Sequence, residues 1–183
     1  MPRLTFHLAT PRLVLRAWQD DDFAPFRALN ADPAVMEFFP ATLTAAQSDA
    51  QAARMRQYMA ERGFTFWAVE LPGVAPFIGI TGLAIPSFSA PFTPCVEIGW
   101  RFATAYWGQG YATEAANAAL TYGFSALGLA EIVAFTAAGN LRSRRVMERL
   151  GMTRAAADDF DHPLLDPDDR LCRHVLYRLS APG

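Results

Sequence analysis

A glycine-containing junction between an apolar strand and a helix constrains this chain most. Residues 106–115 read YWGQGYATEA, and the apolar run at residues 95–102 has the length of a buried strand. Gly108 and Gly110 let the backbone turn sharply, and they lack the Cβ atoms that would keep an anion from the N–H groups at the helix start. The spacing predicts a strand, a loop and a helix. It leaves two interpretations of the loop open, a tight turn or an anion cradle.

Apolar periodicity predicts the other elements. Thr44 and Gln47 form a capping box that begins one helix, Asn140 caps another, and Asp22 offers an N-cap to a third. Strands are predicted at 11–18, 64–71, 76–85, 95–102, 131–137, 152–157 and 171–179, and helices at 22–29, 44–63, 111–127 and 140–151. The order combines a hairpin meander with helix crossovers. It predicts an α/β (α+β) domain with one mixed sheet of about seven strands, flanked by about four helices.

Composition excludes several classes of function. The 183 residues are 52% hydrophobic and 13% aromatic, which suits one folded domain over residues 1–183, with its core at about 10–180. A net charge of -2 gives no basic excess for nucleic acid or an anionic membrane. The apolar runs are too short to span a bilayer and the first residues lack a signal-peptide core, so we expect a cytoplasmic protein. Cys95 and Cys172 are expected to be buried, and no metal site is expected.

Two spaced motifs resemble a known family. The block EIGWRFATAYWGQGYATEAANAAL, followed later by NLRSRRVMERLGM, is similar to the GNAT superfamily of acetyl-CoA-dependent N-acetyltransferases over residues 10–179. Trp107 at the first motif position resembles the branch that acts on ribosomal-protein N-termini. Dinucleotide and ATP loops are disfavoured because Thr113 stands where the dinucleotide motif needs its third glycine. The resemblance implies a GNAT-like single domain whose sheet is splayed between strands 4 and 5, at residues 95–102 and 131–136.

The resemblance also implies a coenzyme site. Backbone N–H groups of the loop and helix start would bind the coenzyme A pyrophosphate, and the adjoining strand would lie beside the pantetheine arm and the acetyl group. Asn140 would contact the pantetheine and Ser143 would point its hydroxyl at the thioester sulfur. Arg144 would reach a coenzyme phosphate, or pair with Glu148 one helical turn away. The implied contacts are Trp107, Gly108, Gln109, Gly110, Tyr111, Ala112 and Thr113 for the loop, Trp100, Arg101 and Phe102 for the strand, and Asn140, Ser143 and Arg144 for the later helix.

Catalysis requires a neutral amine and a stabilised thiolate. Glu97 is the first candidate for the base because it interrupts an apolar strand expected beside the thioester, although an edge carboxylate paired with an arginine is a competing interpretation. His162 is the second candidate, since histidine titrates near neutrality. Met147 occupies the place where many GNAT members carry an acidic tyrosine. Ser143 is therefore predicted to assist the leaving thiolate by a hydrogen bond without being essential.

The acceptor is less constrained. Phe38 and Phe39 are candidates for one wall of its cleft, or for the core, and Asp161 belongs to an aspartate-rich loop that either draws a cationic amine or is simply solvated. The favoured acceptor is a protein or peptide N-terminus, whose amine is more often neutral than a lysine. A small amine such as an antibiotic, amino acid or polyamine is the alternative, and a non-catalytic acyl-CoA sensor is a third hypothesis. Either a monomer or a homodimer is expected.

Overall fold

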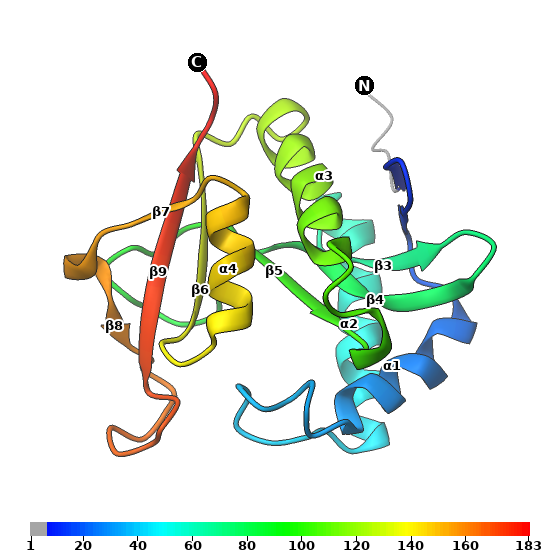
Figure 1. The fold of residues 1–183 in the computed structure, drawn as a ribbon, viewed down its shortest axis with the longest axis horizontal. Coiled ribbons are helices and arrows are strands. Elements are labelled where there is room, and N and C mark those ends of the chain that lie inside the picture. The colour runs from blue at the N-terminus through cyan, green and yellow to red at the C-terminus, as the bar shows by residue number, and fades with distance from the viewer. Residues whose placement is uncertain (1–6) are drawn as a thin grey trace.

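The strands of the computed structural model, which describes residues 7–183, form one open mixed sheet (Figure 1). They are β1 (His7–Ala9), β2 (Val14–Arg16), β3 (Phe66–Leu71), β4 (Ala75–Ala84), β5 (Glu97–Phe102), β6 (Glu131–Ala137), β7 (Thr153–Arg154), β8 (Phe160–Asp161) and β9 (Arg173–Ser180). Their order is β1-β2-β3-β4-β5-β6-β9-β7, and β8 also pairs with β9. The expectation about a signal peptide concerns in part residues 1–6, which lie outside the described residues.

Four helices flank the sheet, as predicted. They are α1 (Phe23–Ala31), α2 (Ala45–Arg62), α3 (Tyr111–Ser125) and α4 (Leu141–Arg149). In Figure 1, α3 and α4 lie in front of the sheet, and α2 passes behind it. None of the helices within residues 7–183 is long and apolar enough to cross a membrane. The predicted mixed fold is confirmed, and the sheet gains the short strands β1 and β8, which the periodicity did not indicate.

The parallel pair β5 and β6 is splayed, as expected. Antiparallel β4 and β5 pair along their whole overlap, from Gly79–Phe102 to Ala84–Glu97. By contrast, β5 and β6 are paired in register only at Glu97 and Val133, with the Val133 N–H donating to the Val96 carbonyl at 3.0 Å. Beyond that point the edges of both strands have backbone groups that do not pair with each other.

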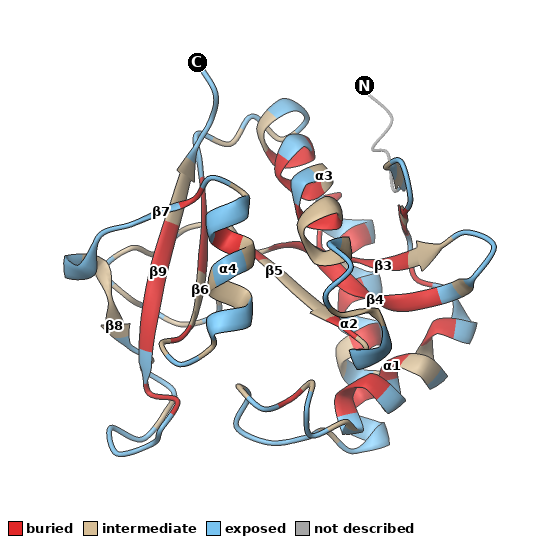
Figure 2. Ribbon diagram, viewed as in Figure 1, coloured by how far each residue is buried: buried red, intermediate tan, exposed pale blue. Residues whose placement is uncertain are grey.

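Alternate residues of β5 face two different layers. Ile98 and Phe102 belong to the larger core cluster, which packs against α3 and α4, and Trp100 packs on the same cluster. Arg101 pairs in register with Ile80, a member of the smaller cluster formed with α1 and α2. We call these the α3/α4 face and the α1/α2 face. Figure 2 shows the buried residues on the sheet and on the inward sides of the helices.

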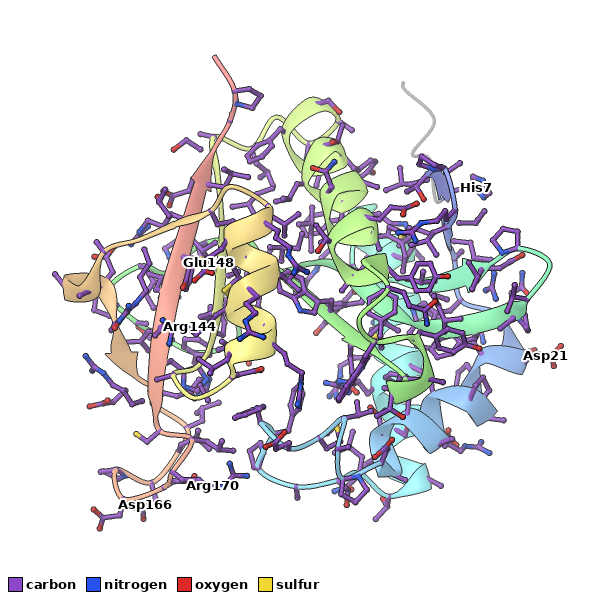
Figure 3. The ribbon with its side chains drawn as sticks, in the orientation of Figure 1. His7, Asp21, Arg144, Glu148, Asp166 and Arg170 are labelled. Carbon is purple, nitrogen blue, oxygen red and sulfur yellow. The ribbon has the colours of Figure 1, made fainter. Side chains whose placement is uncertain are left out.

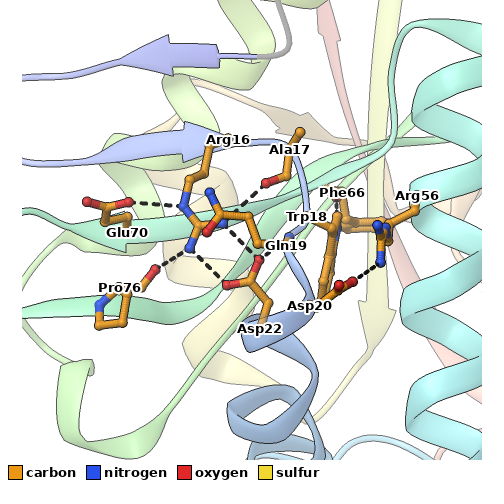
Figure 4. Close-up of polar contacts among 10 residues, drawn as sticks. All are labelled: Arg16, Ala17, Trp18, Gln19, Asp20, Asp22, Arg56, Phe66, Glu70 and Pro76. Carbon is orange, nitrogen blue, oxygen red and sulfur yellow. Dashed lines mark hydrogen bonds and ion pairs between the residues drawn. The ribbon is translucent and has the colours of Figure 1, made fainter.

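The structure confirms two of the three predicted helix N-caps. Thr44 accepts a hydrogen bond from the Gln47 N–H in the predicted capping box, and Asn140 accepts from the Ser143 N–H at 3.2 Å. The exception is Asp22, whose side chain does not cap α1. Its carboxylate instead receives two hydrogen bonds at 2.8 Å from the Arg16 guanidinium, which β2 holds directly behind it (Figure 4). The same carboxylate accepts from the Gln19 N–H at 2.7 Å, so Asp22 caps the preceding 3-10 turn (Asp20–Asp22) and not α1.

Two predicted strands are shorter than their patterns suggested. The first shrinks from residues 11–18 to β2, and the one at 152–157 shrinks to β7, which pairs through only Thr153 and Arg154. A strand needs a partner for its ladder, and alternation within a single segment cannot show where that partner ends. The helix after the glycine loop ends at Ser125, two residues before its predicted end.

Candidate active site

The glycine loop presents a row of free backbone donors. Gly108 and Gly110 have positive φ angles of 74° and 81°, so both glycines are required by the turn itself. Among the described residues, no acceptor is found for the N–H groups of residues 108–113, which we call the loop amides. Tyr111 begins a 15-residue helix, whose dipole adds partial positive charge at this end. The loop is therefore a tight turn that, within the described residues, leaves these N–H groups without an acceptor.

Trp107 departs from its implied role. Its N–H donates to the Thr104 carbonyl at 3.1 Å, so this amide is not available to an anion. Its indole Nε1 donates to the Phe102 carbonyl at 2.7 Å, and the Arg142 guanidinium lies 4.4 Å above its ring. The Phe102 side chain is buried in the core. Trp107 and Phe102 thus brace the loop, because their polar groups and apolar surfaces already have protein partners.

Arg12 holds the loop from a distant segment and was missed by the sequence analysis. Its Nη1 donates to the Gln109 carbonyl at 3.0 Å, and its Nε pairs with Glu114 at 2.6 Å. A Cβ added to Gly110 would lie 3.4 Å from Arg12 Nη2. The sequence analysis predicted a strand at residues 11–18 but gave Arg12 no role, and a long-range contact of this kind leaves no local pattern. Arg12 places positive charge beside the loop amides.

Trp100 and Ser143 meet on the α3/α4 face at the splay. The Trp100 indole Nε1 donates to the Ser143 hydroxyl at 3.1 Å. Asn140 orients the start of α4 through Ser143, and its own amide donates to the Thr136 hydroxyl at 2.9 Å. The structure therefore brings Trp100, Asn140 and Ser143 together from β5 and α4, as the resemblance implied. Met147, one turn later, is buried in the core and supplies no proton.

Arg144 points away from the loop. Its Nη1 donates to the Ala138 carbonyl at 3.0 Å and its Nε to the Tyr177 hydroxyl at 3.4 Å, while that hydroxyl donates to Glu148 at 3.0 Å. Figure 3 shows Arg144 and Glu148 on α4 beside β9. The pairing of Arg144 with Glu148 across a helical turn is thus bridged by a tyrosine. The assignment of Arg144 to a coenzyme phosphate is not supported, because its donors serve the α4–β9 contact.

Glu97 sits where the paired and splayed parts of β5 meet. It is half-buried, and its carboxyl group makes no ion pair within residues 7–183. The competing interpretation, an edge carboxylate paired with an arginine, is therefore wrong. Burial raises the pKa of Glu97 from 4.5 to about 7. A carboxylate with this pKa is suited to accept a proton near neutral pH.

His162 belongs to an aromatic cluster. Its ring lies 4.6 Å from Phe88 and 4.9 Å from His174, and burial lowers its pKa. Phe135 joins the same cluster from β6, two residues beyond the Val133 that pairs with Glu97. Because residues two apart on a strand share a face, the cluster lies on the α1/α2 face of the sheet. His162 is neutral at pH 7 and packs mainly through its ring.

The α1–α2 connection, residues 32–44, reaches across to α4. Glu37 pairs with Arg142 at 2.7 Å, and its carbonyl accepts from Arg170 at 2.6 Å. Phe38 is half-buried and would contact a Cβ at Gly139. The Phe39 ring lies 4.2 Å from the Arg101 guanidinium carbon, in a cation–π contact. Both phenylalanines therefore border the splay, in line with a wall of the cleft.

Asp161 is engaged elsewhere. Its exposed carboxylate pairs with Arg173 at 3.2 Å on β9. Asp158 and Asp159 of the same acidic loop pair with Arg178 and Arg154. These three carboxylates are therefore paired with arginines, which reduces the charge that was expected to draw a cationic amine. Within residues 7–183 there is also no group of three or more His, Cys, Asp or Glu side chains arranged to hold a metal ion.

The comparisons with known proteins agree with this geometry. A family model described as acetyltransferase (GNAT) domain matches residues 12–153. This chain belongs to the GNAT acetyltransferase family. YkkB of Bacillus subtilis, described as uncharacterised, is 34% identical over 146 residues, which cover 79% of this chain and 84% of YkkB. YnaD, an uncharacterised N-acetyltransferase of the same organism, is 32% identical over 149 residues, covering 81% and 83%.

A solved structure supports the same assignment. The GNAT-family acetyltransferase from Bacillus anthracis superposes with a TM-score of 0.78 at 25% identity, covering 95% of this chain and 98% of that one. The chain is thus an enzyme, an acetyltransferase that carries out acetyl-CoA-dependent N-acetylation.

Proposed function

We propose that this acetyltransferase binds the pyrophosphate of acetyl-CoA on its loop amides and acetylates a primary amine at the splay between β5 and β6. The carrying observation is the run of N–H groups at residues 108–113 without a protein acceptor. The residues present suit the group, because glycines at 108 and 110 keep side chains off these amides and Arg12, paired with Glu114, holds the loop through the Gln109 carbonyl. When bound, acetyl-CoA supplies an acetyl group activated as a thioester.

The other site residues follow from the faces of β5. Trp100, Asn140 and Ser143, on the α3/α4 face, contact the pantetheine end, and the Ser143 hydroxyl donates to the sulfur. Glu97 accepts the proton of the attacking amine, directly or through water, because burial raises its pKa to about 7. His162 remains the second candidate for this base. Phe38 and Phe39 form the wall of the acceptor cleft contributed by the α1–α2 connection.

The favoured acceptor is the N-terminal amine of a protein or peptide. Such an amine has a pKa of about 7.8, so it needs less help from a base than a lysine. The ribosomal-protein-S5-alanine acetyltransferase of Vibrio fischeri shares the fold at a TM-score of 0.75, with 14% identity. A small amine is the second candidate, since the spermidine N-acetyltransferase of Vibrio cholerae also shares the fold, at 0.73 and 20% identity. At such low identities, these likenesses support the fold alone. A cytoplasmic location remains part of the proposal.

Replacing Gly110 by alanine tests the loop. Gly110→Ala is expected to weaken acetyl-CoA binding about tenfold and to lower stability by about 1–2 kcal/mol, because a side chain is strained at its φ of 81°. Gly73→Ala is the matched control. Gly73 lies in the β3–β4 turn with a φ of 75°, and an added Cβ would meet nothing within 4 Å. The Gly73→Ala variant should therefore lose stability through backbone strain but keep its affinity for acetyl-CoA. Calorimetric titration and urea unfolding measure the two effects.

Three outcomes are informative. Wild-type acetyl-CoA affinity in folded Gly110→Ala would show that the loop serves only as a turn. If Gly110→Ala and Gly73→Ala lost the same affinity for acetyl-CoA, the loss would be explained by lower stability alone. Thiol release from acetyl-CoA over a panel of amines tests catalysis separately, and tight coenzyme binding without release to any amine would favour the non-catalytic sensor.

A further inference from the structure

Arg101 is a half-buried cation on β5 whose Nε atom is closed from solvent. Among the described residues, no carboxylate lies within 4.0 Å of its guanidinium, whereas the other inward-facing arginine of the sheet, Arg16, pairs with both Asp22 and Glu70. Burial lowers the pKa of Arg101 to about 10, which leaves it charged at neutral pH. Holding an uncompensated charge in the protein interior is costly, so its retention calls for an explanation.

The contacts of Arg101 satisfy only part of its guanidinium. Nη1 donates to the Asn30 side chain and, at 3.4 Å, to Gln51, and the Phe39 ring covers one face. Nε is closed from solvent and has no hydrogen-bond partner. Nη2 also makes no hydrogen bond within residues 7–183, but it is not closed from solvent. Nη2 is therefore the donor of the side-on Nε–Nη2 fork that a carboxylate can reach from solvent.

The position of Arg101 relates this fork to the acetyl transfer. Its neighbour Trp100 faces the other layer and contacts Ser143, so the guanidinium and the proposed thioester site lie on opposite faces of the same strand. Glu97 lies four residues earlier on the face of Arg101, roughly 13 Å away along the strand. Between them is Gly99, against which the Phe66 ring packs so closely that a Cβ would meet it at 2.9 Å.

We propose that Arg101 binds a carboxylate of the acceptor, so that the substrate is an amine that also carries a carboxylate. The inference rests on the proposed function and deepens it. The carboxylate contacts Nη2, the apolar part of the acceptor lies along Phe66, and the amine is directed toward Glu97 and the splay. A polyamine is disfavoured, because it would bring further positive charge to an unpaired cation. Either a free amino acid or an acidic residue near a peptide N-terminus supplies this chemistry.

Matched acceptors test the proposal. Thiol release from acetyl-CoA would be measured with β-alanine and β-alaninamide, with phenylalanine and phenylalaninamide, and with Ala-Asp and Ala-Asn peptides carrying amidated C-termini. The carboxylate member of at least one pair is expected to have a kcat/KM about tenfold higher, as loss of a charge-assisted hydrogen bond implies. A preference within either of the first two pairs would indicate that the acceptor is a free amino acid. A preference within the third pair would indicate a peptide with an acidic residue. Equal kcat/KM values within all pairs would overturn the proposal.

Substitutions at Arg101 test whether this residue causes the preference for carboxylate-bearing acceptors. Arg101→Gln is expected to reduce the ratio of kcat/KM for carboxylate over amide to less than about threefold, because the charged contact is removed. Arg27→Gln is the matched control, since Arg27 joins the same two helices through its exposed pair with Asp49. It should retain the full preference. Should Arg101→Gln fail to fold, Arg101→Lys keeps the charge without the fork and should show an intermediate preference. A preference unchanged in either Arg101 variant argues against the assignment.

A binding measurement separates this proposal from the proposed function. The thermal unfolding midpoint would be recorded with 3-phenylpropionate and with 3-phenylpropionamide, which lack an amine and cannot be acetylated. The carboxylate should stabilise the wild-type protein more than the amide does, and Arg101→Gln should lose this difference. This result would support the carboxylate site even if no acceptor amine caused thiol release from acetyl-CoA. In that case only the catalytic proposal would fail. Equal stabilisation by the two compounds, together with thiol release, would leave an acetyltransferase without this carboxylate site.

Discussion

At the scale of single residues, β5 separates two chemical tasks by alternation. Trp100 contacts Ser143 on one face, and Arg101 lies against Asn30 on the other. Glu97 shares the face of Arg101 and is the ionisable group whose pKa lies nearest neutrality on this strand. The strand thus carries a candidate base and an unpaired cation toward the same layer, while its other face serves the core and α4.

Glu97→Gln is predicted to change the pH dependence of stability. Because the pKa of Glu97 is raised from 4.5 to about 7 in the fold, the native protein holds this proton more tightly than the unfolded chain. The resulting stabilisation is fully present below about pH 4.5 and is lost as pH rises through 7. At pH 8 the wild type should therefore have lost about 3 kcal/mol relative to the glutamine variant. Urea unfolding of both proteins at pH 4.5 and pH 8 measures the difference.

The same variant tests the base. The kcat/KM of the wild type should rise with pH through an ionisation near 7, and Glu97→Gln should lack that ionisation and be slower by about 10²–10⁴-fold. The acceptor amine titrates in both proteins, so the comparison isolates Glu97. If both proteins gave the same profile and rate, His162 would become the leading candidate.

At the scale of elements, α4 is positioned as a unit facing the splay. Asn140 caps it, Arg144 and Glu148 connect it to β9 through Tyr177, and Arg142 joins it to the α1–α2 connection. The cap therefore does more than end a helix, since it sets where the Ser143 hydroxyl lies relative to Trp100.

Ser143→Ala is predicted to lower kcat by about 2–10-fold, the effect of one neutral hydrogen bond. The reason is that the alanine neither assists the leaving thiolate nor accepts from the Trp100 indole at the splay. Ser143→Thr keeps the hydroxyl and should stay closer to the wild-type rate. Steady-state kinetics at saturating acetyl-CoA and amine make the comparison, and an unchanged kcat in Ser143→Ala would remove the hydroxyl from the mechanism.

At the scale of the whole molecule, a buried ion pair connects the sheet to the α1/α2 layer. Arg16 is 8% exposed and Asp22 is 2% exposed, and Arg16 also donates to the Pro76 carbonyl at 2.6 Å (Figure 4). The pair joins β2 to the start of α1 and reaches β4. The layer that it supports carries Asn30 and Gln51, the neighbours of Arg101.

Asp22→Ala is predicted to lower the free energy of unfolding by about 3–5 kcal/mol, because it leaves Arg16 buried with only part of its charge balanced. Asp49→Ala breaks an exposed pair with Arg27 between α1 and α2, and it should cost less than about 1 kcal/mol. Urea unfolding at neutral pH compares the two variants. If both variants lost a similar free energy of unfolding, the buried Arg16–Asp22 pair would contribute no more to stability than the exposed Arg27–Asp49 pair.

The sequence by itself determined the local features of this protein. The capping residues Thr44 and Asn140, the turn at Gly108 and Gly110, and the order of strands and helices all depend on neighbours along the chain. Such features follow from backbone geometry and short-range hydrogen bonds, and they sufficed to predict the mixed fold and the glycine turn, whereas the splay was implied by the family resemblance.

Tertiary structure alone decided which side chains remain available. Trp107 and Arg144 carried suitable groups for the coenzyme, but Thr104, Phe102, Ala138 and Tyr177 already receive their hydrogen bonds. The resemblance implied that Arg101 contacts the pantetheine arm of the coenzyme. Because side chains alternate along a strand, Arg101 instead faces the α1/α2 layer. Its lack of a counter-ion depends on residues 50 and more positions away. Charge compensation is set by distance in space, which the spacing of residues along a chain does not encode.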